Sequence, residues 1–172
     1  MPQVDREQDL QLLLDHARAA GEIARRHHGT DVETWEKDEG AGPVTEADME
    51  IDAMLRERLT AARPNYGWLS EETEDDSERC SRDVTFIVDP IDGTRAFMRA
   101  GDDFCHALAI AERGEVVAAA VLKATKREPS CRRELGCHRA RSALEQHRLS
   151  QIKAATRLVA GRSLSTQGRV GL

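Results

Sequence analysis

The sequence predicts a mixed α/β protein whose helices and strands form layers. Two helical patterns come first along the chain, and four short apolar runs of strand length follow them before residue 123. The 172 residues are 40% hydrophobic and 33% charged, which matches a globular protein and argues against a disordered one. No apolar run reaches the length of a membrane span, so we expect no membrane partner and a cytoplasmic location.

The first helix is predicted over residues 5–28, where apolar side chains recur with helical spacing and Gly29 provides a stop signal. The second begins at Thr45 and ends at Pro64, which cannot continue a helix. A loop is expected between them. The apolar stripes consist of Leu10, Leu13, Leu14, Ala17, Ala20 and Ala24 in the first helix, and of Ala47, Ile51, Met54, Leu55, Leu59 and Ala62 in the second.

Four strands are expected where apolar residues form short runs. The runs lie at residues 66–69, 84–88, 104–111 and 116–122. Arg113 and Gly114 join the last two runs, and such a two-residue connection predicts an antiparallel hairpin. Pro90 is expected to end the second strand, because proline has no amide hydrogen to give to a sheet.

Residues 123–150 differ in character from those before them. They hold 8 Lys and Arg against 3 Glu, and their apolar residues follow neither a strand nor a long helical period. A solvated basic surface is expected there, and without aromatic residues we expect no nucleic-acid partner. A further strand is predicted at residues 157–161. These changes divide the chain into residues 1–122, 123–150 and 151–172.

Acidic residues are concentrated in one part of the chain. Residues 1–103 hold 26 Asp and Glu against 12 Lys and Arg, whereas residues 104–172 hold 5 against 13. Carboxylates gathered in this way can bind a hard cation. An acidic solvated surface explains the composition equally well, so the motifs must decide.

Two carboxylates flank a proline in the string IVDPIDGT. Asp89 and Asp92 follow an expected strand, so both can project toward one point. Close carboxylates repel each other unless a cation or a proton lies between them, and oxygen ligands select Mg²⁺, Ca²⁺ or Mn²⁺. Gly93 allows an unusual turn, and the amides from Thr94 onward can attract phosphate. The alternative is an ordinary turn, since Asp, Pro and Gly all favour turns.

Two other segments carry carboxylates with simpler explanations. Thr45 and Asp48 have the spacing of a capping box at the start of the second helix. Glu71 and Glu72 follow an expected strand, and they also open an acidic run typical of a solvated surface.

Together, GPVTEAD at residues 42–48, SEET at 70–73 and DPIDGT at 89–94 resemble the motifs of the inositol monophosphatase superfamily, in the same order and at similar separations. The resemblance covers about residues 5–122 and resumes at LVAGRS, residues 158–163. It implies the N-terminal part of the family's αβαβα sugar-phosphatase fold. It also implies a Mg²⁺-dependent, Li⁺-inhibited phosphomonoesterase that uses two or three ions, for which Mn²⁺ can substitute.

The resemblance also implies roles for residues. Glu71, Asp89 and the carbonyl of Ile91 would hold one Mg²⁺ and its attacking water. Asp89 and Asp92 would help to hold a second ion near the leaving-group oxygen.

Three further roles follow from the same resemblance. Thr94, paired with Asp48, would orient and deprotonate the attacking water. The amides of Gly93 and Thr94 would receive the phosphate, and Lys37 would tune a water network in the preceding loop.

The chain also departs from the family's pattern. The second half of family members supplies another Asp ligand in a Trp-Asp motif, yet no aspartate follows Asp103 here. The chain therefore resembles a truncated member, and we expect apolar strands such as residues 116–122 to be exposed. A non-catalytic, metal-binding remnant is the alternative to an enzyme.

The string DGTRAF, followed by GDDF, resembles the bisphosphate nucleotidase branch of the family, the CysQ-like proteins. The implied reaction is hydrolysis of 3′-phosphoadenosine 5′-phosphate to AMP and phosphate. Inositol 1-phosphate is the alternative substrate, and histidinol phosphate is a third. A small phosphorylated substrate is the expected partner, and a homodimer is a further expectation.

Overall fold

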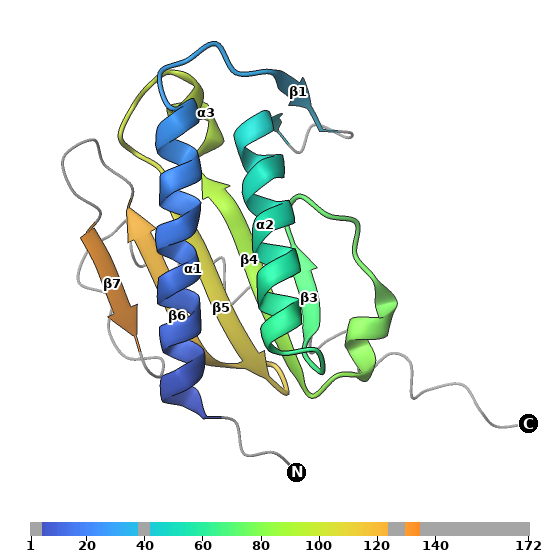
Figure 1. Cartoon of the computed structure of the whole chain (residues 1–172). Helices are drawn as coiled ribbons and strands as arrows, with labels where there is room; N and C mark the ends of the chain where they lie inside the picture. Colours follow the sequence, from blue (N-terminus) through green and yellow to red (C-terminus); the bar gives the residue numbers. More distant parts are fainter. Residues whose placement is uncertain (1–4, 38–41, 124–129, 135–172) are drawn as a thin grey trace, which may run out of the picture.

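The computed structural model describes residues 5–37, 42–123 and 130–134. In this part of the chain, two long helices cover one face of a five-stranded sheet with the order β3-β4-β5-β6-β7 (Figure 1). The elements that carry the fold are α1 (Arg6–His27), α2 (Glu46–Ala62), α3 (Thr94–Met98), β3 (Gly67–Ser70), β4 (Val84–Asp92), β5 (Cys105–Glu112), β6 (Glu115–Lys123) and β7 (Ser130–Glu134). A two-stranded sheet pairs β1 (Thr34–Glu36) with β2 (Pro43–Thr45), and a short 3-10 helix covers Ser77–Ser81.

Both predicted helices are confirmed, and their ends have clear causes. The side chain of Asp5 accepts a hydrogen bond from the amide of Gln8 at the start of α1, and Thr45 caps α2. These bonds satisfy amides that have no partner within the helix. At its other end, α2 stops before Pro64 as expected.

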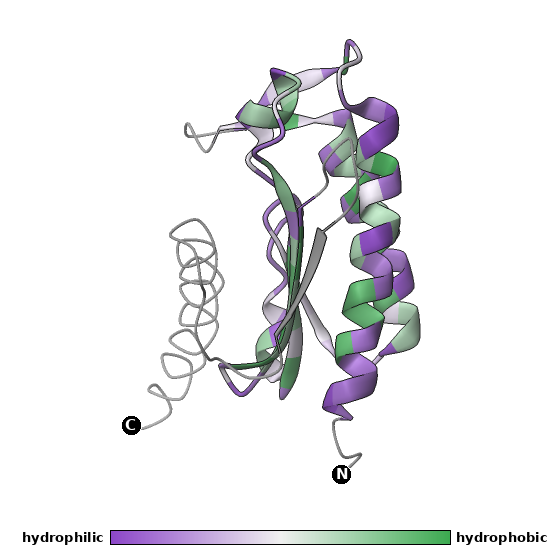
Figure 2. Cartoon of the chain, turned by 90° about the vertical axis from the view of Figure 1, so that its left-hand side faces the viewer, coloured by the Kyte–Doolittle hydropathy of each residue, from purple (hydrophilic) through white to green (hydrophobic). Residues whose placement is uncertain are grey.

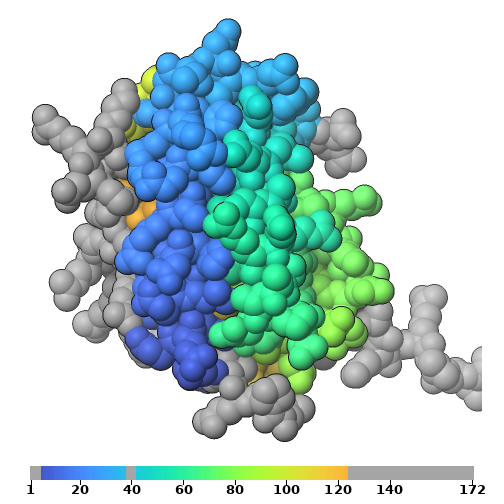
Figure 3. All heavy atoms as spheres, in the orientation of Figure 1, coloured from blue at the N-terminus to red at the C-terminus, as the bar shows by residue number. Residues whose placement is uncertain are grey.

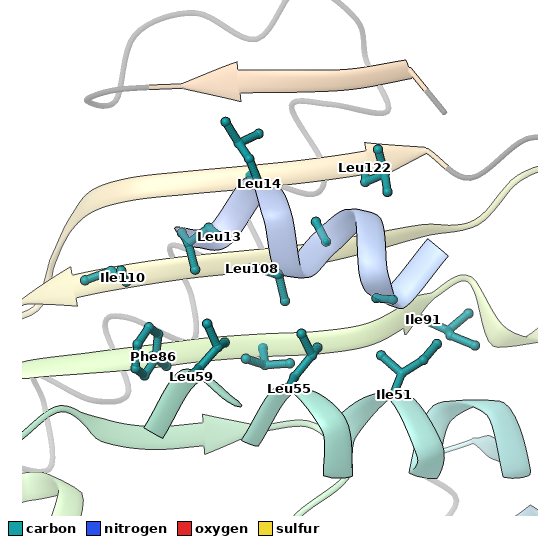
Figure 4. Close-up of a cluster of buried hydrophobic side chains, with 14 of the residues drawn as sticks. Leu13, Leu14, Ile51, Leu55, Leu59, Phe86, Ile91, Leu108, Ile110 and Leu122 are labelled. Atoms are coloured by element: carbon teal, nitrogen blue, oxygen red, sulfur yellow. The ribbon is translucent and has the colours of Figure 1, made fainter. Parts of the chain in front are cut away.

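The two helical stripes pack together on the sheet. Figure 3 shows α1 and α2 side by side over one face, and Figure 2 shows the sheet edge-on with both helices on the same side. Leu13 of α1, Leu55 of α2 and Leu108 of β5 belong to this one core (Figure 4). The stripe prediction fails at two positions of the second helix: Ala62 is exposed and Met54 is half-buried. The opposite face of the sheet forms a second, smaller cluster from Ile87, Ala107, Ala109, Ala111 and Ala119.

The prediction that Pro90 ends its strand is wrong. β4 continues to Asp92, and its antiparallel register with β5 shifts between Asp89 and Asp92. Two residues separate Asp89 from Asp92, whereas only His106 separates their partners on β5. The extra residue forms a bulge, in which a residue without an amide hydrogen is tolerated.

The hairpin between β5 and β6 is confirmed. Arg113 and Gly114 have φ angles of 49° and 84°, and the flanking residues Glu112 and Glu115 are paired. Positive φ at both central residues is the geometry that matches the twist of a two-residue hairpin.

Two expectations about the rest of the sheet are also wrong. β7 lies within residues 123–150, where no strand was expected, and pairs antiparallel with β6. Its string SCRRE has no apolar alternation, so only backbone pairing identifies it. Residues 117–120 and 122 are buried rather than exposed. α1 packs across β6 on the face of Ala118, Ala120 and Leu122, whereas Ala119 belongs to the cluster on the opposite face. The strand predicted at residues 157–161 lies outside the described residues.

No helix in the part of the chain that the structure describes is both long and apolar enough to cross a bilayer.

Candidate functional site

The N-terminus of α2 brings Asp48 to the site. Oδ2 of Asp48 accepts hydrogen bonds from the amide of Thr45 at 2.8 Å and from its hydroxyl at 2.5 Å. The capping box is therefore real. The remaining oxygen, Oδ1, faces the hydroxyl of Thr94 at 3.5 Å. Burial raises the pKa of Asp48, although the bonds from Thr45 oppose this effect. The cap and the expected pairing with Thr94 occur together.

The turn from β4 into α3 fixes the position of Thr94. Its hydroxyl donates to the carbonyl oxygen of Ile91 at 3.0 Å as well as facing Asp48. Gly93 has a φ of 102°, and a Cβ there would lie 2.6 Å from the carbonyl oxygen of Asp103. Only glycine meets both conditions, so the sharp turn expected from the sequence is present.

Asp89 lies where β4 enters the bulge. Its Oδ1 is buried and receives no hydrogen bond from any residue that the structure describes. Burial, together with the nearby charges of Glu71 and Asp92, raises the pKa of Asp89 to about 9. A carboxylate in these surroundings is stabilised by a proton or a cation.

Lys37 joins the two glutamates that follow β3. Its Nζ donates to Oε1 of Glu71 at 3.0 Å and to Oε1 of Glu72 at 2.8 Å. The side chain of Glu72 is 3% exposed and that of Glu71 is 52% exposed. Burial raises the pKa of Glu72 to about 7, against the opposing effect of Lys37. For Lys37 itself, burial lowers the pKa, but the two hydrogen bonds outweigh burial and raise it.

One residue that holds the bulge was not found from the sequence. His106 on β5 is fully buried, and its Nδ1 donates to the carbonyl oxygen of Pro90 at 2.5 Å. Burial lowers the pKa of His106 to about 4, so the ring is neutral at pH 7. Its Nε2 is buried without a hydrogen-bond partner among the described residues. A lone histidine in an apolar strand carries no signal of such a contact.

The oxygen atoms of the site suit a hard cation, although they do not form a complete coordination shell. In the described ranges, no three His, Cys, Asp or Glu side chains already surround a common point, and Glu71 is paired with Lys37. The carboxylates of Glu71 and Asp92, whose charges act on Asp89, offer oxygen atoms, which Mg²⁺ and Ca²⁺ prefer. A cation bound there would give the buried Oδ1 of Asp89 a partner and would lower the pKa of the carboxyl group.

Comparison with known proteins places this geometry in a family. Residues 5–169 match the model of the Inositol monophosphatase family. The chain belongs to the inositol monophosphatase family. The family predicted from the motifs around Asp48, Glu71 and Asp89 is thus confirmed.

Curated relatives share this part of the chain. Inositol monophosphatase 2 of Saccharomyces cerevisiae is 35% identical over 103 residues, which is 59% of this chain and 35% of that protein. An inositol-1-monophosphatase of Caulobacter vibrioides is 38% identical over 110 residues, or 63% and 43% of the two chains. A 3′-phosphoadenosine 5′-phosphate phosphatase of Mycobacterium bovis is 45% identical over 56 residues, or 33% and 21%. The chain spans less than half the length of these relatives.

A solved member of the inositol monophosphatase family has the same architecture. The IMPase of Thermotoga maritima superposes with a TM-score of 0.65 and 27% identity, over 74% of this chain and 48% of the other. The predicted α/β class and the family fold are therefore confirmed.

Proposed function

We propose that this chain is a Mg²⁺-dependent phosphomonoesterase. The observation that carries the proposal is the buried Oδ1 of Asp89, which has no donor within the described residues. Burial and the charges of Glu71 and Asp92 raise the pKa of this carboxyl group. Two solved structures of the same fold add support. One is an IMPase/NADP phosphatase complexed with Mg²⁺ and phosphate, and another is complexed with NADP and Ca²⁺.

Oxygen atoms on either side of the bulge would hold the ions. Glu71, Asp89 and the carbonyl of Ile91 would hold one, and Asp89 with Asp92 would help to hold a second. Bound there, the ions would neutralise the phosphate, lower the pKa of a water and stabilise the leaving alkoxide. Lys37 would keep Glu72 as its partner if Glu71 turned toward an ion.

Thr94 and Asp48 would handle the proton of the attacking water. Both bonds from Thr45 fall on Oδ2 of Asp48, so Oδ1 is the oxygen that faces the Thr94 hydroxyl. The hydroxyl passes its proton to Asp48 as it takes one from the water. The water oxygen bonds to phosphorus, and the ester oxygen leaves with its electron pair. The raised pKa of Asp48 suits a proton acceptor, and the amides of Gly93 and Thr94 would receive the phosphate.

The proposed substrate is 3′-phosphoadenosine 5′-phosphate, hydrolysed to AMP and phosphate. The 45% identity to the Mycobacterium bovis phosphatase supports this choice, as does 38% identity over 77 residues to the 3′(2′),5′-bisphosphate nucleotidase CysQ of Haemophilus influenzae. Inositol 1-phosphate is the second candidate, because the Caulobacter vibrioides relative matches over 110 residues. A metal-binding chain without turnover is the third candidate.

Phosphate release from each substrate tests the proposal. The full chain is assayed with Mg²⁺, with and without Li⁺, beside Asp89→Asn and the control Glu57→Gln, which removes an exposed charge from α2. We expect release from the bisphosphate nucleotide that Li⁺ inhibits, that Asp89→Asn abolishes and that Glu57→Gln leaves unchanged. Release that continues in EDTA, or no release at all, would contradict the enzymatic proposal.

A further inference from the structure

A second buried carboxylate on α2 has no part in the proposed reaction. Asp52 lies one helical turn after Asp48 and is 5% exposed. Its Oδ1 accepts a hydrogen bond from the hydroxyl of Ser70 at 2.5 Å, and its Oδ2 accepts one from the hydroxyl of Thr73 at 2.6 Å. Hydroxyl bonds to an ionised carboxylate are among the stronger hydrogen bonds in proteins. Asp52 thus binds both ends of the Ser70–Thr73 loop, the segment that carries the two glutamates of the site.

Further bonds connect this anchor to the backbone of the loop. The Ser70 hydroxyl oxygen accepts a hydrogen bond from the amide of Glu72 at 3.2 Å. The amide of Glu71 donates to the carbonyl of Val88 on β4 at 3.1 Å. The loop is therefore tied to β4 through its backbone and to α2 through Asp52. Removing Asp52 would leave two hydroxyls without their acceptor in a buried region.

The placement of Glu71 depends on this backbone. Its side chain is 52% exposed and pairs with Lys37, so little packing holds the carboxylate itself. Glu71 nevertheless lies close enough to Asp89 to raise the pKa of that group. A displaced loop would therefore change the separation of these two carboxylates.

We infer that Asp52 is a positioning residue, which holds the Ser70–Thr73 loop so that the carboxylate of Glu71 faces Asp89 at the spacing that a divalent cation needs. The inference rests on the proposed function only in taking a divalent cation as the ligand of these two groups. Residues that orient metal ligands through hydrogen bonds commonly change metal affinity by about 10–100-fold when they are replaced.

Binding of Mn²⁺ to the full chain tests the inference without any turnover. Mn²⁺ is titrated by electron paramagnetic resonance into the wild type, Asp52→Ala, Asp52→Asn and the control Glu57→Gln, well below each melting temperature. We expect Asp52→Ala to weaken Mn²⁺ binding by about 10–100-fold. Asp52→Asn keeps an acceptor for one hydroxyl and should lose less, while Glu57→Gln should bind as the wild type does.

Fluorescence of Trp68 provides a second measurement in metal-free protein. Its indole nitrogen donates to Oγ1 of Thr73 at 3.4 Å, so it reports on the loop directly. The chain has two tryptophans, and Trp35→Phe leaves only Trp68. In this background, Asp52→Ala should shift the emission of Trp68, and Glu57→Gln should not.

The outcomes separate the inference from the proposed function. Weakened Mn²⁺ binding and shifted emission in Asp52→Ala uphold the role of Asp52, even if the wild type releases no phosphate. A folded Asp52→Ala protein with wild-type Mn²⁺ affinity overturns it, whatever its activity. If the wild type binds no Mn²⁺, the proposed function fails, and the Trp68 measurement alone upholds or overturns the anchoring of the loop.

Discussion

His106 donates a hydrogen bond from Nδ1 to the carbonyl oxygen of Pro90, 2.5 Å away, inside the bulge that separates Asp89 from Asp92. The ring belongs to β5 and the carbonyl to β4, so the contact crosses the sheet at the point where its regular pairing is interrupted. The imidazole thus supplies a hydrogen-bond donor for a carbonyl oxygen inside the bulge. The bulge, and with it the separation of the two aspartates, therefore depends on a buried side chain of the neighbouring strand.

Stability should fall with acid more steeply in the wild type than in His106→Asn. The pKa of His106 is about 4 in the folded protein and 6.5 in a model peptide. The unfolded chain therefore binds the proton first, and the free energy of unfolding decreases as pH falls from about 6.5 to about 4. The contribution is at most about 3 kcal/mol. Asparagine can donate to the carbonyl without titrating, so denaturant unfolding of both proteins across this pH range isolates the effect. Parallel curves would contradict it.

Removing the charge of Lys37 should make the metal-free protein less stable and its response to Mg²⁺ larger. Lys37→Met leaves the buried carboxylate of Glu72 without its partner, at a cost of about 1–3 kcal/mol. Mg²⁺ then meets no competing ammonium at Glu71. Melting curves in EDTA and in millimolar Mg²⁺ measure both effects. Lys123→Met is the matched control, since its ion pair with Asp103 is exposed. Equal Mg²⁺ shifts in both variants would argue against competition by Lys37.

Thr94→Ala should lower turnover and leave metal affinity nearly unchanged. The hydroxyl of Thr94 bridges Asp48 and the carbonyl of Ile91, and we assign it to the water rather than to the ion. Loss of a proton-transfer group typically costs about 10²–10⁴-fold in rate. Steady-state kinetics, with Mn²⁺ binding in parallel, checks this, and Thr94→Ser should recover most of the rate. Equal losses of rate and affinity would show that Thr94 has another role.

Gly93→Ala should destabilise the fold more than Gly42→Ala. Both glycines have a φ near 100°, a conformation that costs a non-glycine residue about 1–3 kcal/mol. A Cβ on Gly93 would also lie 2.6 Å from the carbonyl oxygen of Asp103, whereas none of the described atoms lies within 4 Å of a Cβ on Gly42. The difference between the two unfolding free energies measures the close contact alone. Equal losses would mean that the backbone near Asp103 moves aside freely.

Local patterns predicted the parts of this fold that depend on neighbouring residues. The two helices, the cap at Thr45 and the hairpin at Arg113 follow from spacing, capping and turn chemistry, and the structure confirms them. β7 could not be predicted in this way, because its residues have no apolar alternation. Its backbone pairing with β6 identifies it as a strand. The bulge at Pro90 was missed because its donor comes from another strand.

The site shows the same division. Asp48 was expected from its motif, whereas the contacts of Lys37 with Glu71 and Glu72 were not predicted. His106 and Asp52 were missed, since each acts through a partner distant in the sequence. The i, i+4 spacing of Asp48 and Asp52 was a usable signal, because it places both carboxylates on one face of the helix. Polar partners for Asp52 could therefore have been sought beside those of Asp48.

All the groups proposed to hold ions, water or phosphate lie between Lys37 and Thr94, whereas the residue that fixes the bulge comes later, in β5. Contacts over short sequence separations close at a small entropic cost and tend to form early. During synthesis, the carboxylates leave the ribosome before His106 does, because they precede it in the sequence. Until β5 has paired with β4, these carboxylates repel one another. Pairing of β5 with β4 is the step that completes the site, so a chain stopped before residue 105 would have every proposed ligand and lack the contact that separates them.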